Sequence, residues 1–323
     1  MKARLTLALM VALCSRSAAL LPAGRLHRRH LGHHRHLGHH RRATVTAATA
    51  NPVIVCPAQF GTAEDYEGLT ATLKAAGHPA VAVCGLTRFS WLRIVPNVFT
   101  EAFIKGELRA TPTLDFFFEA IDEAVEKVRR ECGEDTEITF LGHSIGGWVM
   151  RAYLTERPEV RAKTSNICSL GSPNRSPPSG TVWAEIDQTR GLLKSVNSGW
   201  QELDARPPTL CVIGRGTQGG LRLPIWDDEV GRSTALEGVV AASSYLALCG
   251  NAFAVGDGLI PVEAATVEVG GDGAAGVKTL EIEDCNHSGF VPTPGASLLL
   301  PETYLWYGSP TITAQWVPHL SEF

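Results

Sequence analysis

Short apolar runs alternate with longer amphipathic stretches along most of the chain. The runs are five or six residues long, which is the length of a β-strand, and they lack the polar alternation of a strand with one wet face. Continuous apolar runs of this kind are typical of a parallel sheet that is covered on both faces. They lie at 52–56, 80–84, 137–141, 165–170 and 209–213.

Between these runs, the spacing of apolar residues predicts helices at 64–76, 113–132, 147–154 and 238–248. Residues 181–206 are also expected to be helical and amphipathic. A long connection covers 85–111, and we expect its large apolar side chains to anchor it to the body: Phe89, Trp91, Leu92, Phe99 and Phe103.

This alternation predicts an α/β fold with a mostly parallel central sheet and helices on both faces. Residues 266–269 and 278–283 are expected to close the sheet as a strand pair. No linker divides the chain after residue 50. We therefore expect one domain over 51–323, with lid-like insertions around 172–206 and 216–255.

The first fifty residues differ from the rest of the chain in composition. They contain nine Lys and Arg and no Asp or Glu. Lys2 and Arg4, an apolar run at 5–14 and small residues at 17–19 are typical of a signal peptide. The basic, His-rich stretch that follows resembles the second part of the leader of plastid proteins in algae with complex plastids. We expect residues 1–50 to be a removed or disordered leader for a plastid, with plain secretion as the alternative.

The remaining chain is acidic. Residues 51–323 hold 20 Lys and Arg against 33 Asp and Glu. Because such a surface repels phosphates, we exclude nucleic acid as a partner. The seven cysteines of this region are scattered, mostly inside apolar runs and without a C-x-x-C pair. Buried reduced thiols are therefore expected in place of disulfides.

Candidate chemistry centres on the segment Gly142-His-Ser-Ile-Gly146, which stands between a predicted strand and a predicted helix. A G-x-S-x-G pattern in this context is typical of a nucleophile elbow. The elbow holds its serine in a strained backbone conformation, and glycines are needed where side chains would collide with the strand and the helix. Ser144 is the predicted nucleophile.

A serine hydroxyl needs a base within hydrogen-bond reach, and the base needs an acid to orient it. On such an elbow, the acid and then the histidine follow the serine along the chain. His287 directly follows the last predicted strand and is the expected base. His78 precedes the elbow, His319 lies in the final stretch, and His143 is expected to pack beneath the elbow.

The acid is predicted to be Asp257, in the tight turn Gly256-Asp-Gly-Leu-Ile-Pro261. Asp204, Asp227 and Asp228 also lie between the serine and the histidine and are the alternatives. The negative oxygen formed during acyl transfer needs two N–H donors. We expect one from Ile145 and the other from Gln59, in the loop after the first strand, with Phe60 as its alternative.

Several motifs in order resemble an α/β-hydrolase family of plants, algae and cyanobacteria, and the resemblance runs from about residue 51 to the C-terminus. The motifs are Val53-Ile-Val-Cys-Pro-Ala-Gln-Phe-Gly61, Leu86-Thr-Arg-Phe-Ser-Trp-Leu-Arg93, Gly142-His-Ser-Ile-Gly-Gly-Trp148, Gly256-Asp-Gly-Leu-Ile-Pro261 and Trp306-Tyr-Gly-Ser309. The resemblance implies the α/β-hydrolase fold, lipase- or esterase-like activity and frequent plastid targeting. It also implies Ser144, Asp257 and His287 as the triad. Pro57-Ala58 departs from the His-Gly usual in hydrolases and leaves the donor loop less defined.

Together these residues predict a serine hydrolase that cleaves a carboxylic ester. No metal or organic cofactor is expected, because the body has no G-x-G-x-x-G, P-loop or zinc spacing. Acyl transfer to an alcohol by the same triad is one alternative, and a non-catalytic binding protein of the same fold is another.

The substrate is expected to be a small-molecule or lipid ester, and the sequence does not fix the oligomeric state. Apolar residues in the two insertions favour a lipid. We expect them to line an acyl pocket, to contact a membrane surface or to pack as a lid: Trp183, Trp200, Leu221, Leu223, Ile225 and Trp226.

Overall fold

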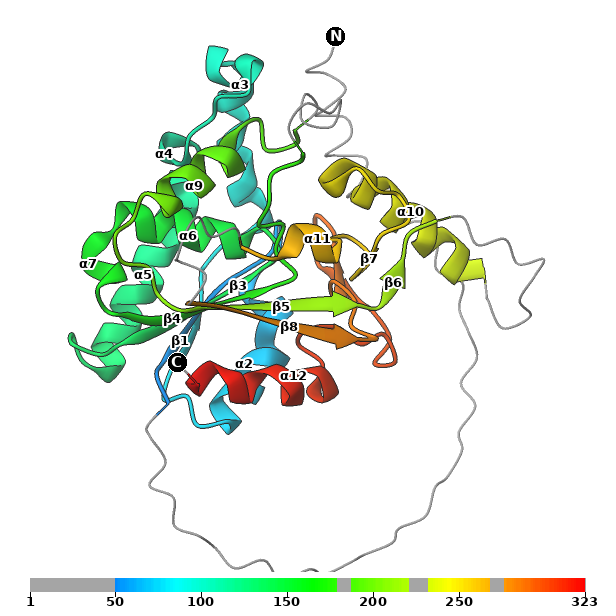
Figure 1. Cartoon of the computed structure of the whole chain (residues 1–323). Coiled ribbons are helices and arrows are strands. Elements are labelled where there is room, and N and C mark those ends of the chain that lie inside the picture. The colour runs from blue at the N-terminus through cyan, green and yellow to red at the C-terminus, as the bar shows by residue number, and fades with distance from the viewer. Residues whose placement is uncertain (1–49, 179–186, 221–231, 268–275, 323) are drawn as a thin grey trace, which may run out of the picture.

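A six-stranded parallel sheet forms the centre of the molecule (Figure 1). The computed structural model describes residues 50–178, 187–220, 232–267 and 276–322. The strand order is β2-β1-β3-β4-β5-β8, and every neighbouring pair is parallel. The strands are β1 (Val53–Cys56), β2 (Val81–Val83), β3 (Ile138–His143), β4 (Thr164–Leu170), β5 (Thr209–Arg215) and β8 (Val277–Glu283).

Helices cover both faces of the sheet. Along β1, Ile54 and Cys56 point into one apolar core, and Val53 and Val55 into another, as the two-residue period of a strand requires. The first core lies on the side of α5 (Asp115–Cys132), α6 (Gly146–Glu156) and α9 (Leu192–Gln201). The second lies on the side of α2 (Glu67–Ala75) and α12 (Pro310–Trp316), which Figure 1 shows together below the sheet.

Further elements complete the described chain. The helices among them are η2 (Ala63–Tyr66), η3 (Arg88–Phe99), α3 (Glu101–Lys105), α4 (Ala110–Thr113), α7 (Pro158–Arg161), α10 (Arg232–Cys249), α11 (Val262–Ala265) and η5 (Val317–Ser321). Two small antiparallel pairs join β6 (Thr217–Gln218) to β7 (Val255–Gly256), and β9 (Phe290–Pro292) to β10 (Ser297–Leu299).

The five strands and the main helices predicted from the apolar pattern are confirmed. Residues 85–111 connect β2 to α5, as expected, but the short helices η3, α3 and α4 that occupy most of the connection were not predicted. The first of them begins at a capping box. Thr87 Oγ1 accepts from the N–H of Ser90, and the N–H of Thr87 donates to Ser90 Oγ, which starts the 3₁₀-helix.

The expected pairing of 278–283 with 266–269 is only partly covered, because 268–269 lie outside the described residues; Thr266 and Val267 are in no strand, and β8 pairs with β5 over seven residues. One further expectation needs correction. Residues 181–206 do not form one helix, because Arg190 and Gly191 have positive φ angles of 52° and 87°. Helix α9 begins only after them.

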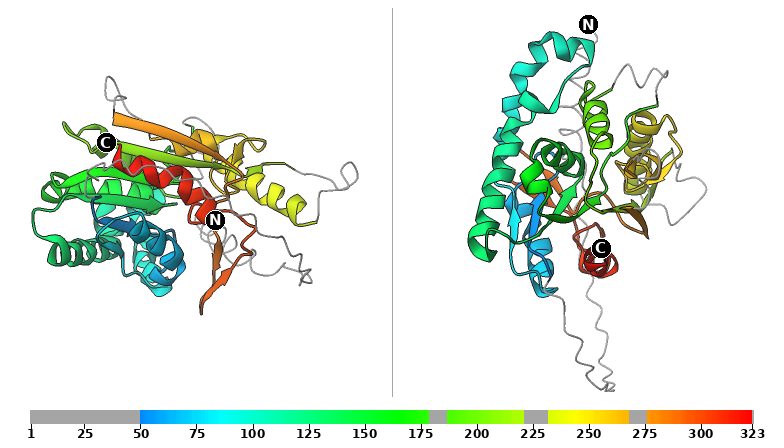
Figure 2. Two further views of the ribbon diagram at one scale, coloured as in Figure 1. Left: turned by 90° about the horizontal axis from the view of Figure 1, so that it is seen from below. Right: turned by 60° about the vertical axis from the view of Figure 1, so that its left-hand side comes forward.

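The expected anchors of 85–111 divide into two groups. Trp91 and Phe103 are buried, whereas Phe89, Leu92 and Phe99 are exposed to solvent. The anchoring prediction is therefore wrong for three of the five side chains. Helix α3 stands away from the sheet at one end of the molecule (Figure 2).

The cysteine prediction is confirmed for the body. All seven cysteines from Cys56 to Cys285 are free, and five of them are buried. The leader at 1–49 and the insertion residues 179–186 and 221–231 lie outside the described residues, as do Trp183, Leu221, Leu223, Ile225 and Trp226. Trp200 was expected with them but is buried on α9. Within the described ranges, no helix is long and apolar enough to span a bilayer.

We expect Trp316→Ala to lower the free energy of unfolding by about 3–5 kcal/mol. Trp316 has no exposed surface, and its Nε1 donates to the carbonyl of Tyr307 at 3.0 Å. Urea unfolding measures the change. The matched control is Phe253→Ala, whose aromatic side chain is 71% exposed and whose loss costs about 0.5 kcal/mol or less. Equal losses in the two variants would contradict the assignment of α12 to the core.

Candidate active site

Ser144 lies on a sharp turn between β3 and α6. Its φ of 55° is the strained geometry expected of an elbow, and its N–H donates to the carbonyl of Leu170 at 2.9 Å. A Cβ on Gly142 would overlap the backbone of Gly147, and one on Gly146 would overlap the carbonyl oxygen of Cys56. The glycines therefore allow strand, turn and helix to meet at the carboxyl edge of the sheet.

Asp257 and His287 meet at this same edge. His287 Nδ1 lies 2.8 Å from Asp257 Oδ2, and the carboxyl side chain is 1% exposed. Asp257 lies in the turn after β7, where its Oδ1 accepts from the N–H groups of Leu259 and Ile260 at 3.0 and 2.7 Å. A carboxylate only accepts, so Nδ1 of His287 carries the proton and Nε2 offers a lone pair.

The serine and the acid lie on either side of the end of β4. Gly171 follows Leu170, which accepts from Ser144, and a Cβ on Gly171 would overlap Asp257 Oδ2. No hydrogen bond joins Ser144 to His287 among the described residues; such bonds often tighten only when substrate binds. The alternative acid Asp204 is exposed, and Asp227 and Asp228 lie outside the described residues.

His287 is also held through its backbone. Its N–H donates to the carbonyl of Asp257 at 2.7 Å, and its own carbonyl lies 2.8 Å from Nε2 of His143. A carbonyl only accepts, so His143 Nε2 carries a proton. Nδ1 of His143 then accepts from the hydroxyl of Tyr66 at 2.7 Å. The residue next to the nucleophile thus fixes the residue expected to be the base.

His143 is neutral in this arrangement. Burial, followed by the nearby His287, lowers the pKa of His143 to about 3. The packing role predicted for this histidine is therefore observed, with two hydrogen bonds added to it. The other histidines lie elsewhere: His78 Nδ1 bonds the carbonyl of Asn51, and His319 pairs with Glu322 on η5.

A fourth side chain contacts the acid. The hydroxyl of Tyr307 donates to Asp257 Oδ2 at 2.8 Å and accepts from the N–H of Gly214 at 2.8 Å. Burial and the neighbouring Asp257 raise the pKa of Tyr307, so the hydroxyl keeps its proton. Asp257 Oδ2 therefore accepts two hydrogen bonds, one from His287 and one from Tyr307.

The expected oxyanion donors come from two segments, the start of α6 and the turn after β1. Ile145 lies at the N-terminus of α6, whose dipole favours an anion there. Gln59 and Phe60 are the central residues of a turn closed by the N–H of Gly61 on the carbonyl of Ala58 at 2.9 Å. Within the described chain, the backbone N–H groups of Ile145, Gln59 and Phe60 have no hydrogen-bond partner. The structure therefore leaves both Gln59 and Phe60 as candidates for the second N–H donor.

Tyr66 connects this donor turn to the base. Its hydroxyl accepts from the N–H of Ala58 at 2.8 Å and donates to His143, which in turn holds the carbonyl of His287. One hydrogen-bonded chain thus links both halves of the site. Tyr66 lies in the helix predicted at 64–76 and Tyr307 in the motif Trp306-Tyr-Gly-Ser309, but the sequence indicated a site role for neither.

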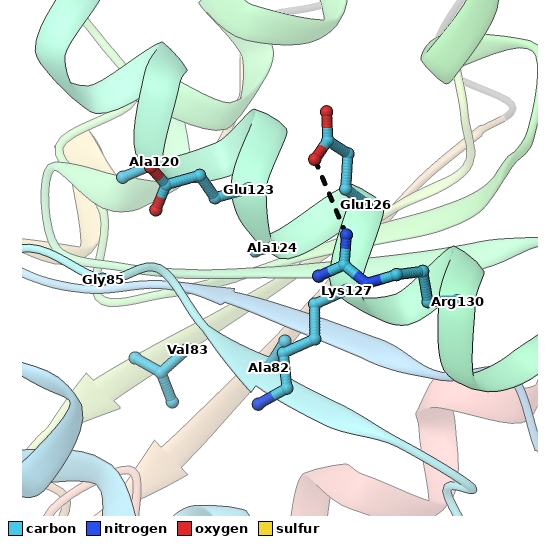
Figure 3. Close-up of a pocket in the computed structure, with 9 residues that line it drawn as sticks. All are labelled: Ala82, Val83, Gly85, Ala120, Glu123, Ala124, Glu126, Lys127 and Arg130. Atoms are coloured by element: carbon cyan, nitrogen blue, oxygen red, sulfur yellow. Dashed lines mark ion pairs between the residues drawn. The ribbon is translucent and has the colours of Figure 1, made fainter.

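Two surface hollows lie away from these groups. The first, about 390 Å³, lies between β2 and α5 and is lined by charged side chains of α5, including Glu126 and Arg130 paired at 3.7 Å (Figure 3). The second, about 680 Å³, lies beside α3 and α4. Neither includes Ser144, Asp257 or His287. In the described residues, no group of three His, Cys, Asp or Glu side chains is arranged to hold a metal ion.

Comparison with known proteins gives only distant likenesses. No family model matches the chain, and no curated protein matches it. Dienelactone hydrolase from Anabaena variabilis is 13% identical over 85% of this chain and 86% of its own, with a TM-score of 0.39. Lipase B from Aspergillus fumigatus is 14% identical over 71% and 48%, with a TM-score of 0.34.

MGS-MChE2, an alpha/beta hydrolase from the metagenome of lagoon sediments at Mar Chica, Morocco, is 13% identical over 76% and 86%, with a TM-score of 0.35. These scores are low, so the assignment rests on the parallel sheet, its strand order and the elbow after β3. The chain has the α/β-hydrolase fold. Because one such fold carries many activities, the fold alone does not define the reaction.

We expect the free energy of unfolding to fall as the pH drops from about 6.5 toward 3. An unfolded histidine takes up a proton near pH 6.5, whereas folded His143 stays neutral down to about pH 3. This proton contributes a slope of about 1.4 kcal/mol per pH unit. His143→Gln, which does not titrate, should show a shallower slope in urea unfolding. Identical slopes would argue against a buried neutral imidazole.

Tyr307→Phe should lower kcat several-fold with little change in KM, because Asp257 then holds the imidazole with one restraint fewer. It should also cost about 1–3 kcal/mol of stability, because the N–H of Gly214 loses its acceptor. Steady-state kinetics and urea unfolding measure both effects. The control is Tyr304→Phe, since the Tyr304 hydroxyl has no hydrogen bond in the described chain. A kcat equal to that of the control would remove Tyr307 from the positioning of the acid.

Proposed function

We propose that the protein is a serine hydrolase that cleaves a carboxylic ester. The observation that carries this proposal is the buried 2.8 Å hydrogen bond between Asp257 and His287, beside an elbow that holds Ser144 at a φ of 55°. An acid that orients an imidazole at the same edge of the sheet as a serine on an elbow is the arrangement that turns a weak hydroxyl into a nucleophile.

In the proposed reaction, Nε2 of His287 takes the proton of Ser144 while Oγ attacks the ester carbonyl. The oxygen that becomes negative accepts from the N–H of Ile145 and from that of Gln59 or Phe60. Nε2 then gives its proton to the leaving alcohol as the carbon–oxygen bond breaks. Water repeats the sequence on the acyl-serine and releases the acid.

A lipid or small-molecule ester fits the apolar surroundings of the proposed nucleophile. Phe60 packs against Trp91 with ring centroids 5.7 Å apart, and half-buried Ile145 joins the same apolar core. These side chains favour an apolar acyl group over a charged one. Acyl transfer differs from hydrolysis only in the acceptor, an alcohol in place of water, so product analysis separates the two.

We also propose that the protein belongs to the α/β-hydrolase family of plants, algae and cyanobacteria that its motifs resemble, and that the leader delivers it to a plastid. The motifs quoted for that family include the donor loop, the elbow and the acid turn. A fusion of residues 1–50 to a fluorescent protein, expressed in an alga with a complex plastid, tests the delivery; fluorescence in the medium would instead indicate secretion.

An active-site serine phosphonate probe should label the full chain, and Ser144→Ala should abolish the labelling, because Oγ is the proposed nucleophile. Hydrolysis of p-nitrophenyl esters of rising chain length should be lost with it. Mass spectrometry locates the label. Absence of Ser144-dependent labelling would overturn the hydrolase proposal in favour of a binding protein.

The acid is tested in the same assay by a matched pair of variants. Asp257→Asn should lower kcat by about 10³-fold or more, because an amide cannot stabilise the imidazolium. Asp204→Asn, an equal change at an exposed carboxylate, should leave kcat unchanged. If Asp257→Asn retained full activity and Asp228→Asn lost it, the acid would be Asp228.

A further inference from the structure

Five large apolar side chains stand exposed on the segment that follows β2, and we call them the apolar ridge: Phe89, Leu92, Val95, Phe99 and Ile104. Half of the exposed large apolar side chains among the described residues lie on this one segment of sixteen residues. Phe99 is 81% exposed, more than any other of them. Exposed apolar side chains gathered on one segment often mark a site of interaction.

The ridge follows from the helix type. A 3₁₀-helix has about three residues per turn, so Phe89, Leu92 and Val95 line one edge of η3. The residues between them hold the helix in place: Trp91 is buried, with its ring 5.3 Å from that of Phe116 on α5. The exposed edge is therefore presented by a helix that is anchored on its other side.

The start of the ridge is fixed by a second anchor. The Arg88 guanidinium donates to Ser297 Oγ at 2.7 Å and lies 3.6 Å from Asp65. It thereby joins η3 to η2 and to the β9–β10 hairpin. The hairpin carries two more exposed apolar residues, Leu298 and Leu299, beside this contact.

The ridge lies on the same edge of the sheet as the proposed nucleophile. Helix η3 leaves the carboxyl end of β2, and the elbow leaves the carboxyl end of β3, two strands away in a parallel sheet. Trp91 connects the two places, because its ring also packs on Phe60 of the donor turn. Figures 1 and 2 show α3, at the far end of the ridge, standing clear of the sheet.

The charges around the ridge cancel within pairs. Arg93 bonds Glu119 through two contacts of 2.6 and 2.9 Å, and Lys105 lies 2.7 Å from Glu101. The body as a whole is acidic, with 20 basic against 33 acidic residues over 51–323. An anionic surface would repel this body, whereas an uncharged or zwitterionic one would not.

We propose that the apolar ridge inserts into the surface of a zwitterionic or uncharged lipid phase and brings the site to its ester there. The proposal deepens the proposed function and rests on it, because it assigns the ester substrate to that phase. Protruding apolar side chains fit a deformable lipid surface, into which single residues can insert. A stable protein partner would cover about 20–30 residues on this side, whereas the ridge has five exposed side chains.

The full chain should sediment with vesicles of phosphatidylcholine. The double variant Leu92→Glu, Phe99→Glu should weaken this binding about tenfold or more, because two apolar side chains no longer enter the lipid. The matched control is Val239→Glu, Phe253→Glu, which adds the same two charges at exposed apolar positions away from the ridge. The control should bind as the wild type does, and thermal unfolding should be alike in all three proteins.

Three results would overturn the proposal. They are a wild type that does not bind the vesicles, a control that loses binding as much as the ridge variant, and a wild-type dimer in light scattering that the ridge variant dissociates. The last would make a second copy of the chain the occupant. Phosphonate labelling of Ser144 without vesicles distinguishes the failures: lost labelling ends the proposed function, while lost vesicle binding with labelling intact ends only this inference.

Discussion

The arrangement of this site depends on one buried negative charge. A carboxylate removed from water needs donors on its oxygens, and Asp257 receives four: two backbone N–H groups, an imidazole and a phenol. These donors come from the turn after β7, from the loop after β8 and from the segment before α12. Satisfying the charge therefore draws three separate parts of the chain together, and one of these parts carries the imidazole of His287.

The hydrogen bonds of the site continue along the backbone. His287 is restrained at its side chain, its N–H and its carbonyl, and the last restraint comes from the residue before the nucleophile. Through Tyr66 the restraint continues to Ala58 in the donor turn. The proposed base, the residue next to the proposed nucleophile and the donor turn are thus joined by one chain of hydrogen bonds, and such preorganisation favours acyl transfer.

Strands buried on both faces could be predicted because their apolar runs are continuous. The elbow could be predicted because only glycines leave room for the strand and the helix to meet there. His287, chosen by chain order, and Asp257, chosen for its tight turn, lie in hydrogen-bond contact. Residues 88–99 escaped prediction because a 3₁₀-helix repeats every three residues and leaves its apolar edge in solvent, so apolar identity was read as burial. Tyr66 and Tyr307 were missed since a hydroxyl's partner depends on tertiary contacts that no local pattern encodes.

The buried cysteines have a chemical consequence for this edge of the sheet. Cys56 ends the strand that leads into the donor turn, and Cys285 lies two residues before His287. Thiolates are stronger nucleophiles than a serine hydroxyl, but burial raises the pKa of both thiols and keeps them protonated. An electrophile that reaches this edge therefore meets two protonated thiols, which compete little with the proposed nucleophile Ser144. By burying these two thiols, the fold favours reaction at the proposed serine over reaction at sulfur.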